Sequence, residues 1–294
     1  EIGEAASDTP AASMAADSSG RRHAAWSALG EVLEARRASG AGSYSPPTRV
    51  NDNEENPAVF ASQINPAIAK GGSGRIHVAW AERVTDDSGD DRYAVGVATS
   101  TNGGSSFDTV APIYLSPPGA LGAPPGPAIT SDAAGAVYIA WEGHLGEEIL
   151  FAKSTDGGAS FPLKTRVSDA LPDDQFPHFA PAIAVDGAGV IYIAWSDGRD
   201  GPQTGWNLMI AKSIDGGVSF EQNVRVDNTG SQPSDQSFPT LAIDPQGIVH
   251  VAWQDDRNEA GNNDTYYAKS SNAAQSFGAN VRVGPAEGPE DFID

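Results

Sequence analysis

The chain has 294 residues and a formal net charge of −21, with 39 acidic and 18 basic side chains and no cysteine. The lack of cysteine excludes disulfides, thiolate nucleophiles and cysteine-ligated zinc. The charge disfavours nucleic acid and anionic membrane surfaces as partners, and no apolar run in the sequence is long enough to span a bilayer.

A repeated segment organises the chain: an apolar strand that ends in Ala-Trp, a polar loop, a further strand and a tight turn. The first and weakest copy ends at Trp26, and the later ones end at Trp80, Trp141, Trp195 and Trp253. Successive tryptophans are 54, 61, 54 and 58 residues apart. A period of this length built from short strands is typical of a β-propeller.

The best-preserved repeat shows what one unit contains. Strands are predicted at 181–186 and at 190–195, where VIYIAW is too apolar to face water on either side. A third strand at 208–213 leads into the tight turn, and a short fourth strand follows at 224–226. Four antiparallel strands of decreasing burial make one propeller blade.

Five such units fit the chain. We predict an all-β fold: a single domain over residues 1–294 that forms a β-propeller of five four-stranded antiparallel blades. The blades cover roughly residues 10–50, 66–115, 127–168, 181–227 and 239–283. A six-bladed ring is less favoured, because a sixth blade would need further residues. We expect the ring to close, with the two ends of the chain near each other.

The turn between the third and fourth strands has the pattern Ser-x-Asp-Gly-Gly-x-Ser-Phe. The Asp side chain, or an Asn in its place, can accept hydrogen bonds from backbone N–H groups of the turn, and glycine takes a positive φ at no steric cost. The acceptors are Asn102, Asp156, Asp215 and Asn272. The last copy has Ala273-Ala274 in place of Gly-Gly, so we expect that turn to differ. The pattern resembles the Asp box, the bacterial neuraminidase repeat of sialidases. This resemblance implies that the four acceptors stabilise turns away from any active site.

The loops after three of the second strands contain an acid and an arginine. The candidate ligand-binding residues of this rim are Arg83, Asp197, Arg199, Asp255 and Arg257. The resemblance to sialidases, which hold their acidic sugar with an arginine triad, implies one interpretation, in which three arginines converge on a carboxylate. The favoured interpretation is an ion pair within each blade, because these residues recur at the same position of the repeat.

No catalytic residue is assigned from the sequence. The Arg-Ile-Pro segment that sialidases carry before the first Asp box is missing, and no Tyr–Glu pair can be assigned as nucleophile and helper. Sialidase activity is therefore not expected, and the sequence favours a chain without enzymatic activity. Phe238, in the segment that leads into the last repeat, is expected to fill the gap between two blades.

An acidic run at 86–91 is a weak candidate for metal binding. Asp86, Asp87, Asp90 and Asp91 offer hard oxygen ligands for calcium, but their spacing is not that of an EF-hand. A solvated acidic loop is the alternative interpretation. No other cofactor is expected.

The favoured function is a non-catalytic interaction or scaffold module outside the cytoplasm, for example an accessory subunit of a larger periplasmic or surface assembly. Its partner would be a protein, which the sequence does not identify. The alternative is a carbohydrate-active enzyme or glycan-binding protein that uses the axial rim of the propeller. A periplasmic or extracellular location is expected because the sequence starts at Glu1 without a methionine, as after removal of a signal peptide.

Overall fold

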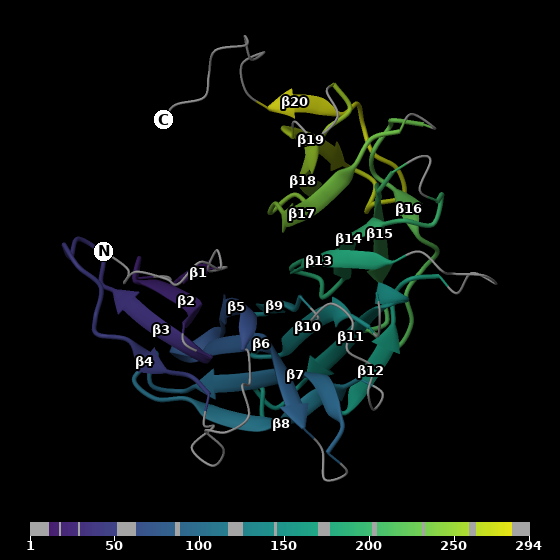
Figure 1. The fold of residues 1–294 in the computed structure, drawn as a ribbon. Coiled ribbons are helices and arrows are strands. Elements are labelled where there is room, and N and C mark those ends of the chain that lie inside the picture. Colours follow the sequence, from purple (N-terminus) through teal and green to yellow (C-terminus); the bar gives the residue numbers. More distant parts are fainter. Residues whose placement is uncertain are drawn as a thin grey trace, which may run out of the picture.

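The computed structural model describes residues 12–17, 19–28, 30–51, 63–85, 89–116, 126–143, 146–169, 177–201, 205–230, 233–258 and 263–283. These residues form five four-stranded antiparallel sheets, with one short 3-10 turn at Gly72–Gly74. Figure 1 shows the sheets as blades around a common centre. The predicted all-β, five-bladed propeller is confirmed. In the described part of the chain, no helix is long and apolar enough to cross a membrane.

Each blade consists of four strands that are consecutive in the sequence. Blade 1 contains β1 (Ala12–Ala16), β2 (Arg22–Ala28), β3 (Glu31–Arg37) and β4 (Thr48–Arg49). Blade 2 contains β5 (Ile64–Lys70), β6 (Ile76–Thr85), β7 (Asp91–Ser100) and β8 (Asp108–Leu115). Blade 3 contains β9 (Ala128–Ser131), β10 (Val137–Glu142), β11 (Ile149–Ser154) and β12 (Leu163–Arg166). Blade 4 contains β13 (His178–Val185), β14 (Ile191–Asp197), β15 (Asn207–Ser213) and β16 (Val224–Arg225). Blade 5 contains β17 (Gln236–Ile243), β18 (Val249–Asp255), β19 (Asp264–Ser270) and β20 (Val281–Val283).

The second strands of blades 3 and 4 are almost continuously apolar because both of their faces are covered by neighbouring blades. In β14, Ile191, Ile193 and Trp195 pack in the core shared with blade 3. Tyr192 and Ala194, which point to the opposite face, pack in the core shared with blade 5. Burying a large apolar side chain contributes about 1.5–3 kcal/mol. The flat faces of neighbouring blades therefore share apolar cores, and side-chain hydrogen bonds such as that from Asn223 to the carbonyl of Val167 add to the contact between blades.

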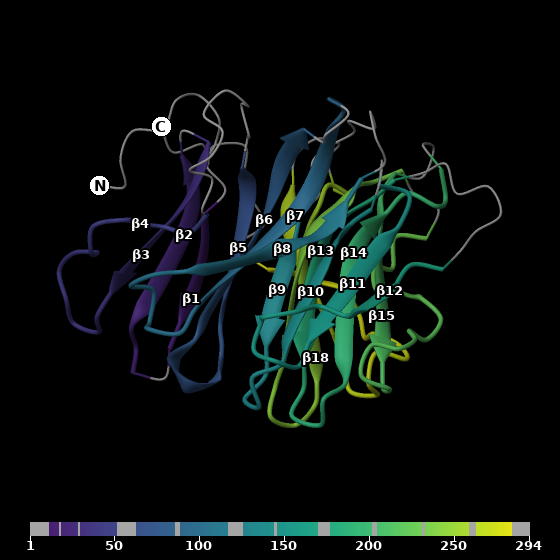
Figure 2. The ribbon, with the colours of Figure 1, turned by 90° about the horizontal axis from the view of Figure 1, so that it is seen from below.

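The strand order gives the propeller two different ends. The first strand of each blade lies nearest the centre in Figure 1, and each strand runs antiparallel to the next one along the chain. One end, which we call the turn end, therefore has the links from first to second strands and from third to fourth strands. The other end, the loop end, has the loops from second to third strands and the starts of the first strands. Figure 2 views these strands from the side.

The turns at 100–107, 154–161, 213–220 and 270–277, called the box turns here, share one hydrogen-bond pattern. In the third of them, the Oγ of Ser213 donates to Asp215 Oδ1 at 2.8 Å, and the backbone N–H of Ser219 donates to the same oxygen at 3.0 Å. The backbone N–H of Gly217 in turn donates to the Oγ of Ser213. These hydrogen bonds, led by those from Ser219, hold the pKa of Asp215 well below its usual range.

The fifth blade keeps this turn, and the expected difference is not found. Asn272 Oδ1 accepts the backbone N–H of Ser276, and the backbone N–H of Ala274 donates to the Oγ of Ser270. Ala273 and Ala274 adopt φ of 56° and 62°. The side-chain acceptor is present, so it compensates the modest strain of an alanine in the left-handed region.

The five blades follow an arc. Figure 1 shows blades 1 and 5 at its two ends, drawn apart from each other. The innermost strands pack against one another in sequence order from β1 to β17, and Met14 on β1 is 68% exposed. The described strands therefore do not form the expected closure between blades 5 and 1. The expected proximity of the two chain ends concerns residues outside the described ones.

Candidate functional site

The loop end contains the acids and arginines of the repeat, and the structure places them in compact networks. Asp197 is fully buried and accepts the indole N–H of Trp195 at 2.7 Å. His178 Nδ1 lies 3.1 Å from the same carboxylate oxygen. Arg199 binds both oxygens of Asp197 through Nε and Nη2, each at 2.7 Å. Burial opposes ionisation of Asp197, but the contacts with His178 and Arg199 outweigh it and hold the pKa well below its usual range.

Blade 5 repeats this network, with a glutamine in place of the histidine. Asp255 accepts the indole N–H of Trp253 at 2.8 Å and binds Arg257 through Nε and Nη2. Gln236 occupies the position of His178 and donates to Asp255 Oδ1 at 3.4 Å. The guanidinium carbon of Arg257 lies 4.1 Å from the centre of the Tyr266 ring.

Blade 2 has a modified version of the network. Glu82 accepts the indole N–H of Trp80 at 3.1 Å, and Arg83 pairs with Asp91 on the adjacent strand instead of with Glu82. Each rim arginine thus contacts a carboxylate of its own blade. Arg199 also reaches Asp169 of blade 3, at 3.6 Å.

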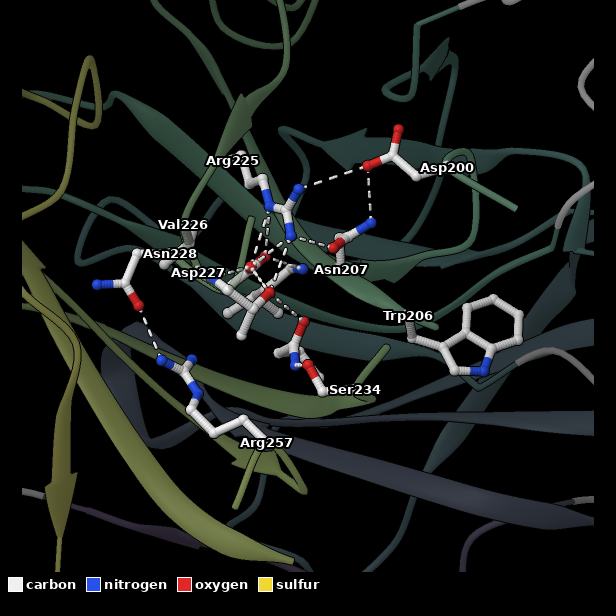
Figure 3. A network of polar contacts seen from close by, with 12 residues as sticks. Asp200, Trp206, Asn207, Arg225, Val226, Asp227, Asn228, Ser234 and Arg257 are labelled. Atoms are coloured by element: carbon white, nitrogen blue, oxygen red, sulfur yellow. Dashed lines mark hydrogen bonds and ion pairs between the residues drawn. The ribbon is translucent and has the colours of Figure 1, made fainter. Parts of the chain in front are cut away.

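A second arginine network, which the sequence did not indicate, lies in blade 4 (Figure 3). Arg225 pairs with the buried Asp227 at 2.7 Å, and its other contacts include Asn207, Asp200 and the Thr229 hydroxyl. Burial works against the charge of Asp227, but hydrogen bonds led by that from Arg225 keep its pKa below the usual value. The carboxylates of this network are therefore occupied by protein groups.

Blade 3 breaks the repeat. Its carboxylate, Glu142, follows Trp141 directly, one position earlier than Asp197 follows Trp195, so it points to the opposite face of the sheet. The indole N–H of Trp141 has no hydrogen-bond partner in the described part of the chain. Glu142 Oε1 instead accepts the backbone N–H of Ala180, on the first strand of blade 4, at 2.6 Å. Burial raises the pKa of Glu142 to about 7, against hydrogen bonds from Ala180 and Gly126.

Two aromatic side chains pack against Phe179, the residue before Ala180. Phe179 on β13 lies edge-on to Trp206, with ring centres 4.5 Å apart, and to Phe238 on β17, at 6.0 Å. Phe238 is 61% exposed, so the expectation that it fills the gap between blades is wrong. The reason is a bulge in β17: the register shifts between Ser237 and Thr240, and Phe238 adopts a φ of 51°.

The same strained conformation recurs at the loop end of three innermost strands. Asn65, Ala180 and Phe238 each precede a proline and have φ of 53°, 52° and 51°. A non-glycine residue in this region costs about 1–3 kcal/mol, and such strain is concentrated at functional sites. It marks the axial loop end as the candidate site.

The calcium candidates lie partly outside the described residues. Asp86 and Asp87 are among those not described, and the carboxylate of Asp91 binds Arg83. Across the described ranges, no group of three metal-ligating side chains comes together.

Sequence reasoning did not single out Glu142, Phe179 or Trp206, which are partly buried at this end. Glu142 had a detectable signal, because its blade lacks the acid two positions after tryptophan. Phe179 and Trp206 had none, since a lone aromatic in a strand or loop is usually part of a core.

No family model matches the chain, and no curated protein matches it. Its fold is similar to an ulvan lyase of polysaccharide lyase family PL25 (TM-score 0.65, 12% identity, 95% of this chain and 72% of the other). It is also similar to an α-L-arabinanase of Penicillium chrysogenum complexed with arabinobiose (TM-score 0.64, 11% identity, 93% and 80%). The sialidase NanB is a third similar structure (TM-score 0.56, 12% identity, 88% and 58%). At these identities, the chain shares with these proteins a β-propeller fold.

Proposed function

We propose that the chain is a carbohydrate-active or glycan-binding propeller that uses the axial loop end. The observation that carries this proposal is the group formed by Phe179, Trp206 and Phe238. Two of the three rings come from innermost strands, and Phe238 is exposed although burying it would be favourable. Exposed aromatic groups beside a few polar ones are typical of ligand sites, and a flat ring matches the apolar face of a sugar.

The comparisons support this proposal over the non-catalytic module that the sequence favoured. The similar structures include a polysaccharide lyase, an arabinanase and an arabinofuranosidase, which are all described as acting on glycans. This support is an analogy of fold, since one fold hosts many functions. A protein partner for the chain remains a prediction of the sequence alone. A location outside the cytoplasm is part of this proposal.

Glu142 is the carboxyl group of the proposed site. Its Oε1 accepts the backbone N–H of Ala180, the residue that follows Phe179 in the sequence, so it binds the same strand that carries Phe179. A carboxyl group with a pKa of about 7 is partly protonated at neutral pH. Such a group can donate a hydrogen bond to a sugar hydroxyl, or protonate a leaving oxygen if the site is catalytic.

The test is oligosaccharide binding followed by calorimetry and by tryptophan fluorescence. We expect at least one oligosaccharide to bind, and we expect Phe238→Ala to weaken that binding about tenfold or more, because a stacking ring contributes on the order of 1.4 kcal/mol. The matched control is Val218→Ala, which removes a side chain that is 65% exposed in a box turn at the turn end. Equal loss in both variants, or no binding by the native chain, would contradict the proposal.

A further inference from the structure

We infer that the proposed site takes an uncharged glycan and discriminates against carboxylated sugars such as sialic and uronic acids. This inference rests on the proposed function and adds the class of ligand. A site for an anionic sugar needs a cation or a cluster of donors aimed at its carboxylate, and Arg is the side chain best suited to that task.

All 18 lysine and arginine residues lie within the described ranges, so the structure locates every one of these cations. Strand direction puts eight arginines near the loop end, where second and fourth strands finish and third strands start. They are Arg49, Arg83, Arg92, Arg166, Arg199, Arg225, Arg257 and Arg282.

Seven of these arginines have a carboxylate partner in their own blade. The pairs in blades 1 to 3 are Arg49–Glu31, Arg83–Asp91 and Arg166–Glu148. Those in blades 4 and 5 are Arg199–Asp197, Arg225–Asp227, Arg257–Asp255 and Arg282–Asp264. The eighth, Arg92, also has an interaction partner. These carboxylates offset the positive charge that the arginines present to an anionic ligand, and the side chains of three of them are fully buried: Asp197, Asp227 and Asp255.

The charge near the aromatic group adds to this discrimination. Glu142 binds the residue next to Phe179, and Asp235 accepts the backbone N–H of Trp206 at 3.0 Å. These two carboxyl groups are held on the same backbone segments as two of the rings, so a carboxylated sugar stacked there would be repelled by their negative charge. An uncharged sugar meets the same groups as hydrogen-bond partners.

The experiment uses pairs of ligands that differ by a carboxylate. Cellotriose and galactotriose are each compared with the same trisaccharide oxidised to carboxylates at C6, lactose is compared with sialyllactose, and arabinobiose is included as a further neutral ligand. Binding is measured by calorimetry at pH 8, where Glu142 is mostly ionised, at low and at high salt. We expect neutral ligands to bind, with affinity insensitive to salt, and the carboxylated member of a pair to bind at least about tenfold more weakly at low salt.

Glu142→Gln supplies a second readout. Removing this charge should reduce the difference in affinity between a neutral ligand and its carboxylated counterpart. Asp215→Asn, a matched removal of charge at the turn end, should leave this difference in affinity unchanged. Tighter binding of the carboxylated members, or equal binding of both, overturns the inference and leaves the proposed function standing. Failure of every neutral and acidic ligand to bind overturns both.

Discussion

Asp197 and Glu142 follow equivalent tryptophans at different distances, and this offset of one residue changes what each carboxyl group contacts. Asp197 faces the indole N–H, a histidine and an arginine, which together stabilise its ionised form. Glu142 faces the neighbouring blade, where the groups that bind it are backbone N–H donors. Burial without a cation favours the neutral acid. Position on the strand, rather than residue type, therefore separates a structural acid from a candidate functional one.

Glu142 should make the stability of the protein depend on pH. Its folded pKa of about 7 lies above the ordinary value of 4.5, so folding favours the protonated form. The contribution to stability is full below about pH 4.5 and is lost as pH rises through about 7, at about 1.4 kcal/mol for each unit between the two pKa values. We expect the free energy of unfolding to fall from pH 5 to pH 8 more steeply in the native chain than in Glu142→Gln. Denaturant titrations at both pH values measure this, and parallel curves would refute it.

At the scale of the element, the size of a residue in each box turn matches the size of the side chain that it faces on the preceding blade. A Cβ added to Gly217 would lie 2.2 Å from the Phe151 ring of the preceding blade. In the next pair of blades, Ala274 takes the place of Gly217 and packs in the core that contains Ile210, the counterpart of Phe151. A large ring thus faces glycine, and a smaller side chain faces alanine. This complementarity explains why the fifth turn tolerates alanine.

Gly217→Ala should therefore destabilise the fold through overpacking as well as backbone strain. The matched control is Gly216→Ala, which adds the same strain at a positive φ but places its Cβ 3.2 Å from the flexible end of Lys153. We expect the first variant to lose about 1–3 kcal/mol more than the second, the usual cost of overpacking. The double variant Gly217→Ala with Phe151→Ile should recover part of this loss of stability, because it reproduces the smaller side chain that faces alanine in blade 5. Denaturant unfolding measures all three, and equal losses in the two single variants would contradict the packing argument.

The same elements show what the sequence could and could not predict. The second strands and box turns were predictable, because their apolar runs and turn residues determine local structure in every repeat. The structure of the loop end was only partly predictable from the sequence. Phe238 lies in a bulge whose register depends on hydrogen bonds to β18, and Trp206 is held by contacts with the start of blade 5. Such contacts between segments distant in sequence leave no periodic signal. The acid–arginine recurrence was visible, but the direction of each guanidinium group required the structure.

At the scale of the whole molecule, charge is the dominant feature. The chain has 39 acids and 18 cations, and seven of these cations are paired with acids at the loop end. The acids outnumber the cations that remain, so most of the unpaired acids repel one another. A net charge of this size favours solubility but opposes the compact state. The described strands of blades 5 and 1 do not share a core. The apolar area that is buried between blades, and that offsets this repulsion, is therefore limited among the described strands to four cores between consecutive blades.

Added salt should therefore stabilise the chain. Sodium chloride at about 0.1 M shortens the range of electrostatic repulsion to about 10 Å, and the melting temperature should rise with concentration until the repulsion is screened. Comparing the melting temperature in calcium chloride and in magnesium chloride at the same ionic strength distinguishes two effects. Screening of charge is the same in both salts, whereas binding at a calcium-specific site is not. We expect the two divalent salts to act alike, because the carboxylate of Asp91 in the acidic run at 86–91 is already bound to Arg83. A rise that is larger with calcium than with magnesium, and that is lost in Asp87→Asn, would instead establish a calcium site in that run.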